Sequence, residues 1–144
     1  MTSTIEDLSE GSFRETIDDP KADPQKIKTL VFTSGKIFFS MNDFRKNENR
    51  EDIAIVRVEQ LYPFPEKQVL EQIAKYSSAS RLIWAQDEPI NMGAWPYINL
   101  NYSHLKLHPV ARKESASPAG GLLVQHNQRL QRIIDEVFSN QPTD

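Results

Sequence analysis

The 144-residue sequence contains no cysteine. The chain therefore cannot form disulfides, thiolate metal sites or a cysteine nucleophile, and its composition suits a reducing compartment. Long apolar runs are absent as well: no stretch approaches the roughly 18 residues of a transmembrane helix, and no charged segment leads into an apolar one as in a signal peptide. We accordingly expect no membrane partner.

Glycine is scarce, with 5 residues in the chain. A loop that cradles phosphate needs clustered glycines whose backbone N–H groups face the anion at a helix N-terminus. The chain offers only the triplet Ser34-Gly35-Lys36, between a predicted strand and a predicted helix. The helix start and the lysine could attract an anion there, but a tight strand-to-helix turn with an exposed lysine is the simpler interpretation.

An excess of charge of one sign is also missing. Charged residues make up 26% of the chain and leave a formal net charge of −3, with both signs mixed along the sequence. This balance predicts no surface for nucleic acid. Of the three histidines, only His104 and His108 have the i, i+4 spacing of helical metal ligands. Because Pro109 disfavours a helix there, we expect no metal site.

Apolar periodicity predicts an alternation of strands and helices from residue 27 onward. Three short runs rich in β-branched residues have the character of buried strands, and the segments between them carry apolar residues at helical spacing. The predicted strands cover residues 27–33, 53–61 and 80–88, and the predicted helices cover residues 36–46 and 65–76. Strands separated by helices in this way pair in parallel, with helices on both faces of the sheet.

The rest of the chain completes the predicted fold. Pro96 suits the first turn of a helix, a short fourth strand is predicted at about residues 107–111, and a clear amphipathic stripe predicts a helix over residues 122–138. Residues 1–25 are acidic, contain two prolines and show no sustained period, which indicates an extended leader rather than an element of the core. We predict an α/β three-layer sandwich with a mostly parallel sheet of four to five strands, formed by one domain over residues 26–144.

No complete catalytic constellation is visible in the sequence. The G-x-S-x-G turn of a serine nucleophile is absent. Asp87 and Glu88 are adjacent carboxylates, but neighbours at a strand end point to opposite faces of the sheet. We therefore assign no catalytic residue, no cofactor ligand and no metal ligand.

Four longer motifs give a more specific indication. They are FTSGKIFF (Phe32–Phe39), AIVRVEQLYPFP (Ala54–Pro65), WAQDEPINMGAW (Trp84–Trp95) and ARKESASPAGG (Ala111–Gly121). In this order and spacing they closely resemble the C-terminal domain of the thiamine-dependent component of 2-oxoglutarate dehydrogenase. That family reads R-x-E-Q-L-x-P-F-P, W-x-Q-E-E-P-x-N-x-G-A-W and G-R-x-x-S-A-x-P-A-x-G at these places. The segment STIEDLSEGSF fits the same family, so the resemblance covers about residues 3–138.

The resemblance implies a transketolase-like C-terminal domain that holds no cofactor. In the family, thiamine diphosphate and magnesium lie between two preceding domains, and the C-terminal domain caps and stabilises the homodimer. Family members are several times longer than this chain and work with a dihydrolipoyl succinyltransferase. We therefore expect the chain alone to be inactive, and its parent to work in a bacterial cytoplasm or, in a eukaryote, in the mitochondrial matrix.

Other assignments stay open at this point. A related 2-oxoadipate dehydrogenase would carry a similar C-terminal domain. The chain could also act as a stand-alone interaction module or as one subunit of a split enzyme.

The WAQDEPINMGAW segment is interpreted as an interface loop. It lies at the carboxyl end of a predicted strand, where open α/β sheets present functional loops, and in the family this end faces the neighbouring domain. The predicted interface residues are Gln86, Asp87, Glu88, Asn91, Gly93 and Trp95. Buried side chains of this loop would satisfy backbone groups of the partner domain, and Gly93 would permit a turn that a side chain obstructs. The alternative is an internal loop that only closes the domain on itself.

Some family members also bind a regulatory nucleotide or acyl-CoA between this domain and the preceding ones. An anion of this kind needs arginines, hydroxyl groups and a helix start. The residues that offer these groups are Ser34, Lys36, Arg57, Arg112, Ser115 and Ser117. Arg57 could instead serve a structural ion pair within its strand.

The chain departs from the family pattern at four positions. Ala111 replaces a glycine, so the backbone at that turn could differ, and Asp87 replaces a glutamate. Thr33 and Ala85 stand where cysteines are common, which indicates that these two positions require only small side chains.

Overall fold

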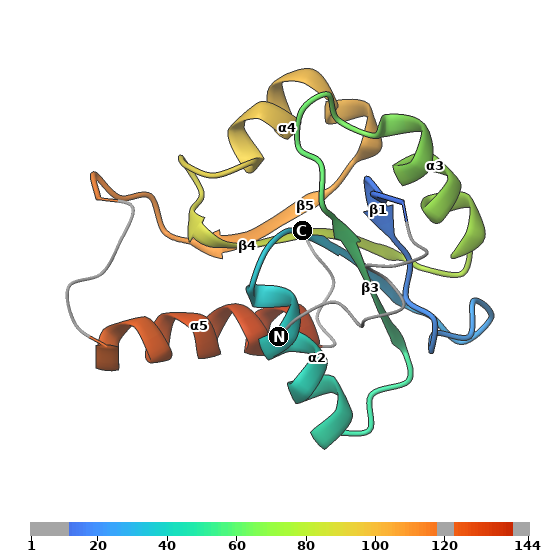
Figure 1. Cartoon of the computed structure of the whole chain (residues 1–144). Helices are drawn as coiled ribbons and strands as arrows, with labels where there is room; N and C mark the ends of the chain where they lie inside the picture. The colour runs from blue at the N-terminus through green and yellow to red at the C-terminus, as the bar shows by residue number, and fades with distance from the viewer. Residues whose placement is uncertain (1–11, 118–122, 140–144) are drawn as a thin grey trace.

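The computed structural model describes residues 12–117 and 123–139. It is a three-layer sandwich in which a sheet lies between helices α3 and α4 on one face and helices α2 and α5 on the other (Figure 1). The elements in chain order are β1 (Thr16–Ile17), β2 (Thr29–Thr33), α2 (Ile37–Asn47), β3 (Ile53–Val58), α3 (Glu66–Lys75), β4 (Arg81–Pro89), α4 (Trp95–Asn101), the 3-10 helix η1 (Ser103–Leu105), β5 (His108–Arg112) and α5 (Leu123–Phe138).

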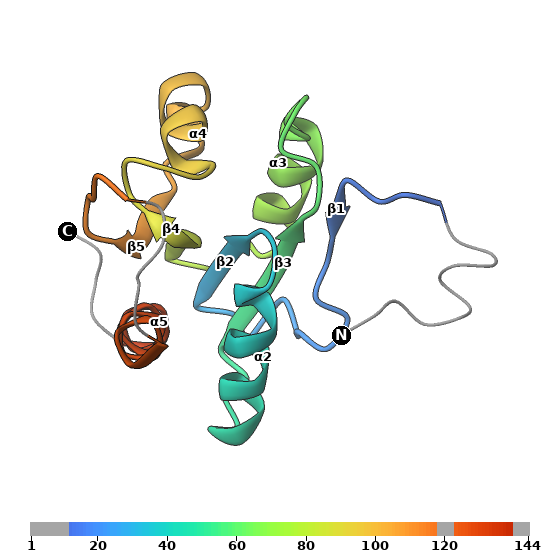
Figure 2. The same cartoon turned by 60° about the vertical axis from the view of Figure 1, so that its left-hand side comes forward.

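The five-stranded sheet has the order β1-β3-β2-β4-β5. Strands β2, β3, β4 and β5 are parallel, and the short β1 pairs antiparallel with β3 at the edge of the sheet, as Figure 2 shows from a second side. All five residues of the central strand β2 are buried. A parallel strand covered on both faces requires this nearly continuous apolar character.

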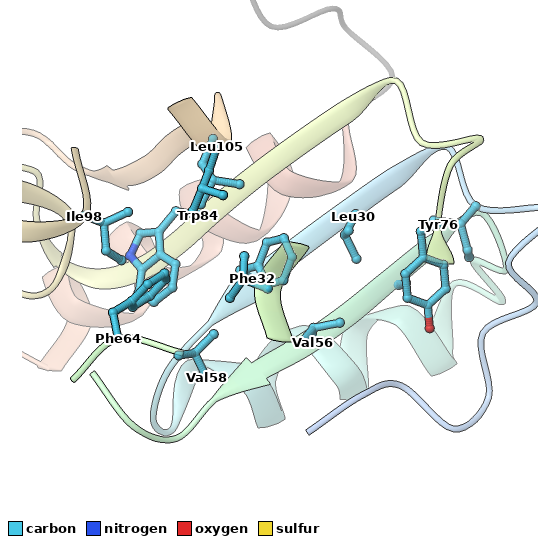
Figure 3. Close-up of a cluster of buried hydrophobic side chains, with 13 residues drawn as sticks. Leu30, Phe32, Val56, Val58, Phe64, Tyr76, Trp84, Ile98 and Leu105 are labelled. Carbon is cyan, nitrogen blue, oxygen red and sulfur yellow. The ribbon is translucent and has the colours of Figure 1, made fainter. Parts of the chain in front are cut away.

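Side chains alternate along the strands between two apolar clusters. Leu30 and Phe32 of β2 belong to the cluster under α3 and α4, whereas Val31 belongs to the cluster against α2 and α5. Figure 3 shows the first cluster, with Trp84 near one end and Tyr76 at the other. Each apolar face of the sheet is therefore closed by its own pair of helices.

The predicted fold class is confirmed, and each element predicted after residue 26 is present within a few residues of its expected bounds. Helix α4 begins at Trp95, so Pro96 lies in its first turn as expected. The N-terminal segment differs from the prediction. Residues 1–25 were expected to lie outside the core. Of these, residues 1–11 lie outside the described part of the chain, but Thr16 pairs with Val58 in the sheet and Asp19 is only 4% exposed.

Two adjacent carboxylates attach this N-terminal segment to both faces of the sheet. Asp19 forms a buried ion pair with Arg45 of α2 and accepts a hydrogen bond of 3.1 Å from the backbone N–H of Ile55. Asp18 accepts a hydrogen bond of 2.8 Å from the Tyr76 hydroxyl at the end of α3 and pairs with Lys75. Since α2 and α3 cover opposite faces, the Asp18-Asp19 pair bridges the two helical layers at the β1 edge.

Replacing Asp19 tests the contribution of the buried ion pair. In the Asp19→Ala variant Arg45, which is 9% exposed, loses its counter-charge, and we expect the free energy of unfolding to fall by about 3 to 5 kcal/mol. Urea unfolding of the 144-residue chain measures the change. The control is Glu51→Ala, which breaks the exposed Lys26–Glu51 pair and should cost less than about 1 kcal/mol. Equal losses in the two variants would contradict the assignment.

The pH dependence of stability tests the Asp18 contacts. Burial acts to raise the pKa of Asp18, but the hydrogen bonds from Lys75 and Tyr76 outweigh it and hold the pKa below its usual value of 3.8. A carboxyl with a lowered pKa stabilises the fold above its unfolded-state pKa, and this contribution disappears as the pH falls through the folded-state pKa. Urea midpoints of the Asp18→Asn variant should therefore lie below those of the unchanged chain near pH 7, and the two should converge below pH 3.8. A constant offset across this range would rule out the linkage.

Candidate functional site

A pocket of ≈ 390 Å³ opens at the carboxyl edge of the sheet. It lies at the end of β4, where the predicted interface segment Trp84–Trp95 begins within the strand and continues beyond it, and where the chain leaves β2 and β3. Its lining residues are Ser34, Gly35, Leu61, Tyr62, Trp84, Gln86, Glu88, Gly93, Ala94 and Tyr97. We call it the carboxyl-edge pocket.

The side chain of Gln86 forms the floor of this region and is 3% exposed. Its carbonyl oxygen accepts hydrogen bonds of 3.0 Å from the Trp84 ring N–H and 2.9 Å from the backbone N–H of Trp95. Its NH₂ group donates to the carbonyl oxygens of Pro89, at 3.1 Å, and Met92, at 2.7 Å. The amide of Gln86 is therefore used within its own segment of the chain, which favours the alternative of a segment that closes the domain on itself. Contact between Gln86 and another domain stays a prediction.

Gly93 packs directly over the Gln86 amide. Its φ of +66° lies in the left-handed region, which glycine adopts without a steric penalty. A Cβ atom at this position would lie 3.0 Å from Gln86 Nε2 and 3.0 Å from Glu88 Cβ. The prediction that a side chain would obstruct the turn is confirmed, although the obstruction comes from the loop itself.

The other predicted interface residues have different surroundings. Glu88 is exposed and lines the carboxyl-edge pocket. The backbone carbonyl of Asp87 accepts a hydrogen bond from Arg112, and its carboxylate lies 4.0 Å from the Arg112 Nε atom. Asn91 is exposed and bonds to the backbone of Ser115 through both ends of its amide. Their contact with another domain stays a prediction.

Aromatic side chains that the sequence analysis did not assign to the site form one wall of the pocket. Tyr62 is 81% exposed, and its ring centroid lies 6.2 Å from that of Tyr97. Tyr97 stands in turn 5.8 Å from Tyr102, and the hydrogen bond between their hydroxyl groups raises the pKa of Tyr97. The signal that could have located Tyr62 is its place in the loop directly after a strand, at the edge already assigned to function.

The six residues predicted to bind a regulatory anion are distributed over separate surfaces. Ser34 lines the carboxyl-edge pocket, whereas Arg112 and Ser115 line a second pocket beside α5. Arg57 lies over the Phe38 ring, 4.7 Å from its centroid, and 3.7 Å from the Glu59 carboxylate, in keeping with a structural ion pair. Lys36 directly precedes α2, and Ser117 donates its backbone N–H to the Ser115 hydroxyl. A shared regulatory site stays a prediction.

Metal-binding groups are dispersed in the part of the chain that the structure describes. Across residues 12–117 and 123–139, no three side chains of histidine, aspartate or glutamate converge as a metal site. His104 lies instead 2.7 Å from the Glu66 carboxylate on the surface. None of the described helices has both the length and the apolar character needed to cross a membrane.

Comparison with known proteins identifies a family. The family model described as 2-oxoglutarate dehydrogenase C-terminal matches residues 2–138. The chain is 40% identical to the 2-oxoglutarate dehydrogenase E1 component of Azotobacter vinelandii and 37% identical to that of Cupriavidus necator, over 95% of the chain in each case. It is 32% identical, again over 95% of its length, to the multifunctional 2-oxoglutarate metabolism enzyme of a Mycobacterium strain. The chain spans 16%, 15% and 12% of these three relatives, respectively.

Two glycine substitutions test the packing around Gln86. Gly93→Ala combines an unfavourable positive φ with a close approach to the Gln86 amide, so we expect the free energy of unfolding to fall by about 2 to 4 kcal/mol. Gly35→Ala is the matched control, because Gly35 has a φ of +73° but no atom within 4 Å of an added Cβ. Its cost should be about 1 to 2 kcal/mol. Urea unfolding measures the free energy of unfolding of both variants. An equal decrease in the two would show that the close approach of the added Cβ to Gln86 does not destabilise the fold.

Proposed function

The chain belongs to the 2-oxoglutarate dehydrogenase C-terminal family, and we propose that it acts as the C-terminal domain of a thiamine-dependent 2-oxoglutarate dehydrogenase. In this role it docks onto the preceding domains of the enzyme and stabilises the homodimer. The docking surface is the carboxyl-edge pocket with its rim. The decarboxylation itself takes place on the preceding domains, and the 144-residue chain alone is inactive.

The observation that carries the proposal is the apolar rim of this pocket. Leu61 is 36% exposed and Tyr62 is 81% exposed, side by side in the loop that follows β3. Large apolar side chains exposed around a pocket are typical of interaction surfaces, and tyrosine is enriched among residues that dominate interfaces. The floor beneath them is fixed by Gln86, so a partner surface would meet a preformed site.

The chemistry of the described residues supports a role in assembly. Thiamine diphosphate with magnesium needs a phosphate cradle and oxygen ligands for the metal. No convergent set of carboxylates or histidines offers such ligands in residues 12–117 and 123–139. This part of the chain does not fit the cofactor, so the proposal places thiamine diphosphate and magnesium on the preceding domains.

The names of the relatives favour 2-oxoglutarate over 2-oxoadipate as the substrate of the parent enzyme. The three relatives compared above are named for 2-oxoglutarate dehydrogenase or 2-oxoglutarate metabolism. A dihydrolipoyl succinyltransferase is then the partner that receives the product, and the bacterial sources of these relatives agree with a cytoplasmic parent.

A chimera tests the proposal. The part of the Azotobacter vinelandii E1 component that aligns with this chain is replaced by the chain, and 2-oxoglutarate-dependent reduction of ferricyanide is measured with thiamine diphosphate and magnesium present. We expect activity from the chimera and none from the isolated chain. Tyr62→Asp in the chimera should lower the activity at least about tenfold, because it places a charge in the docking surface.

Leu70→Asp is the matched control. Leu70 is 45% exposed on α3, away from the pocket, and undergoes the same change from an exposed apolar side chain to a carboxylate. Its activity should stay within about twofold of the unchanged chimera. Turnover by the isolated chain, or equal losses in the two variants, would contradict the proposal.

A further inference from the structure

A second pocket of ≈ 390 Å³ lies at the β5 edge of the sheet, between the end of β5 and helix α5. Figure 1 shows α5 running beneath β4 on the face opposite α4. The charged residues that line this pocket are Arg112, Lys113, Glu114, Arg129, Arg132 and Glu136. Four cations and two carboxylates give it a formal charge of +2, although the whole chain has a net charge of −3. We call it the basic pocket.

Within the described part of the chain, ion pairs neutralise only a minority of the cations that line the basic pocket. Arg112 lies 4.0 Å from the Asp87 carboxylate. Among the residues that the structure describes, no carboxylate lies within ion-pair distance of Lys113, Arg129 or Arg132. Cations held together without counter-charges repel one another, so an anion placed between them is stabilised.

The wall that carries Arg112 is held in place by hydrogen bonds from the interface loop. The Ile90 backbone N–H donates to the carbonyl oxygen of Arg112 at 2.9 Å. Asn91 donates to the carbonyl oxygen of Ser115 at 3.0 Å and accepts from the Ser115 N–H at 3.1 Å. These bonds fix the segment from Arg112 to Ser115 before any ligand arrives, which lowers the entropic cost of binding.

The geometry points to a binding site for a compact multivalent anion, either a phosphate ester or a polycarboxylate, seated between Arg112, Arg129 and Arg132. Guanidinium groups bind both kinds of anion through paired N–H donors. The pocket volume lies within the range of about 300 to 1,000 Å³ that is typical of small-ligand sites. The carboxylates of Glu114 and Glu136 also line the pocket, so an anion is expected to bind on the side of the three arginines.

Titration calorimetry of the 144-residue chain tests this site with two probes, pyrophosphate and citrate, at constant ionic strength. We expect saturable binding of at least one probe with a Kd below about 1 mM. The probe that binds more tightly identifies the class of anion. The Arg129→Glu/Arg132→Glu variant should bind that probe at least about tenfold more weakly, because two donors become repulsive carboxylates.

The control carries the same change of charge away from the basic pocket. Lys46→Glu/Lys67→Glu alters two exposed lysines, on α2 and α3, whose side chains are 53% and 91% exposed. Its Kd should stay within about twofold of the unchanged chain. If the variant of α5 fails to fold, Lys113→Gln/Arg132→Gln replaces it, since both side chains are exposed, and should weaken binding at least about threefold.

Two results would overturn the site. One is the absence of saturation by either probe up to about 10 mM, which is weaker than specific small-ligand binding. The other is equal weakening in the α5 variant and in the control, which would show a diffuse attraction to surface charge. Neither outcome affects the docking proposal, because the carboxyl-edge pocket shares no lining residue with the basic pocket.

Discussion

The buried amide of Gln86 holds the carboxyl edge of the sheet in one conformation. A glutamine side chain offers two N–H donors and two acceptor lone pairs, and the structure uses all four. They join the end of β4, the turn through Pro89 and Met92, and the first residue of α4. The floor of the carboxyl-edge pocket therefore depends on this amide, and Gly93 is required because a larger residue would displace it.

The double coverage of the sheet explains why both pockets lie at its edges. All residues of strand β2 are buried. A ligand or a partner protein can therefore reach this part of the sheet only at the end of the strand. The interface loop links the two edges of interest: its first half supports the carboxyl-edge pocket through Gln86, and its second half supports the basic pocket through Ile90 and Asn91.

Apolar periodicity was sufficient to predict the order of strands and helices, because a sheet buried on both faces imposes its burial directly on the sequence. The family motifs, not the periodicity, indicated that Thr33 and Ala85 require only small side chains. The two residues are register partners, both fully buried, and the Thr33 hydroxyl donates to the Ala85 carbonyl at 2.8 Å. Strand β1 was missed because two residues are too short to show a period. The role of Asp19 was missed because an acidic residue is normally expected on the surface. Its burial is explained only by the ion pair with Arg45, which the folded structure shows.

The candidate site was predictable in position but not in detail. The sequence placed Gln86 at the carboxyl edge of the sheet, where the structure has it. Its hydrogen-bond partners, however, depend on the path of the turn from Pro89 to Trp95, and apolar periodicity contains no information about that path. Arg129 and Arg132 lie on the face of α5 that the apolar stripe leaves polar, and such a face normally predicts solvent contact. Their place beside Arg112 in the basic pocket becomes visible only in the folded chain.

Charged side chains are used differently at the two edges of the sheet. At the β1 edge they form ion pairs within the domain, whereas at the β5 edge several cations line a pocket. At the β1 edge, Asp18 and Asp19 meet Lys75 and Arg45, so each carboxylate is neutralised within the domain. At the β5 edge, the cations of the basic pocket exceed the carboxylates beside them. Because cations held close together repel one another, an anion bound in the basic pocket would offset part of this repulsion.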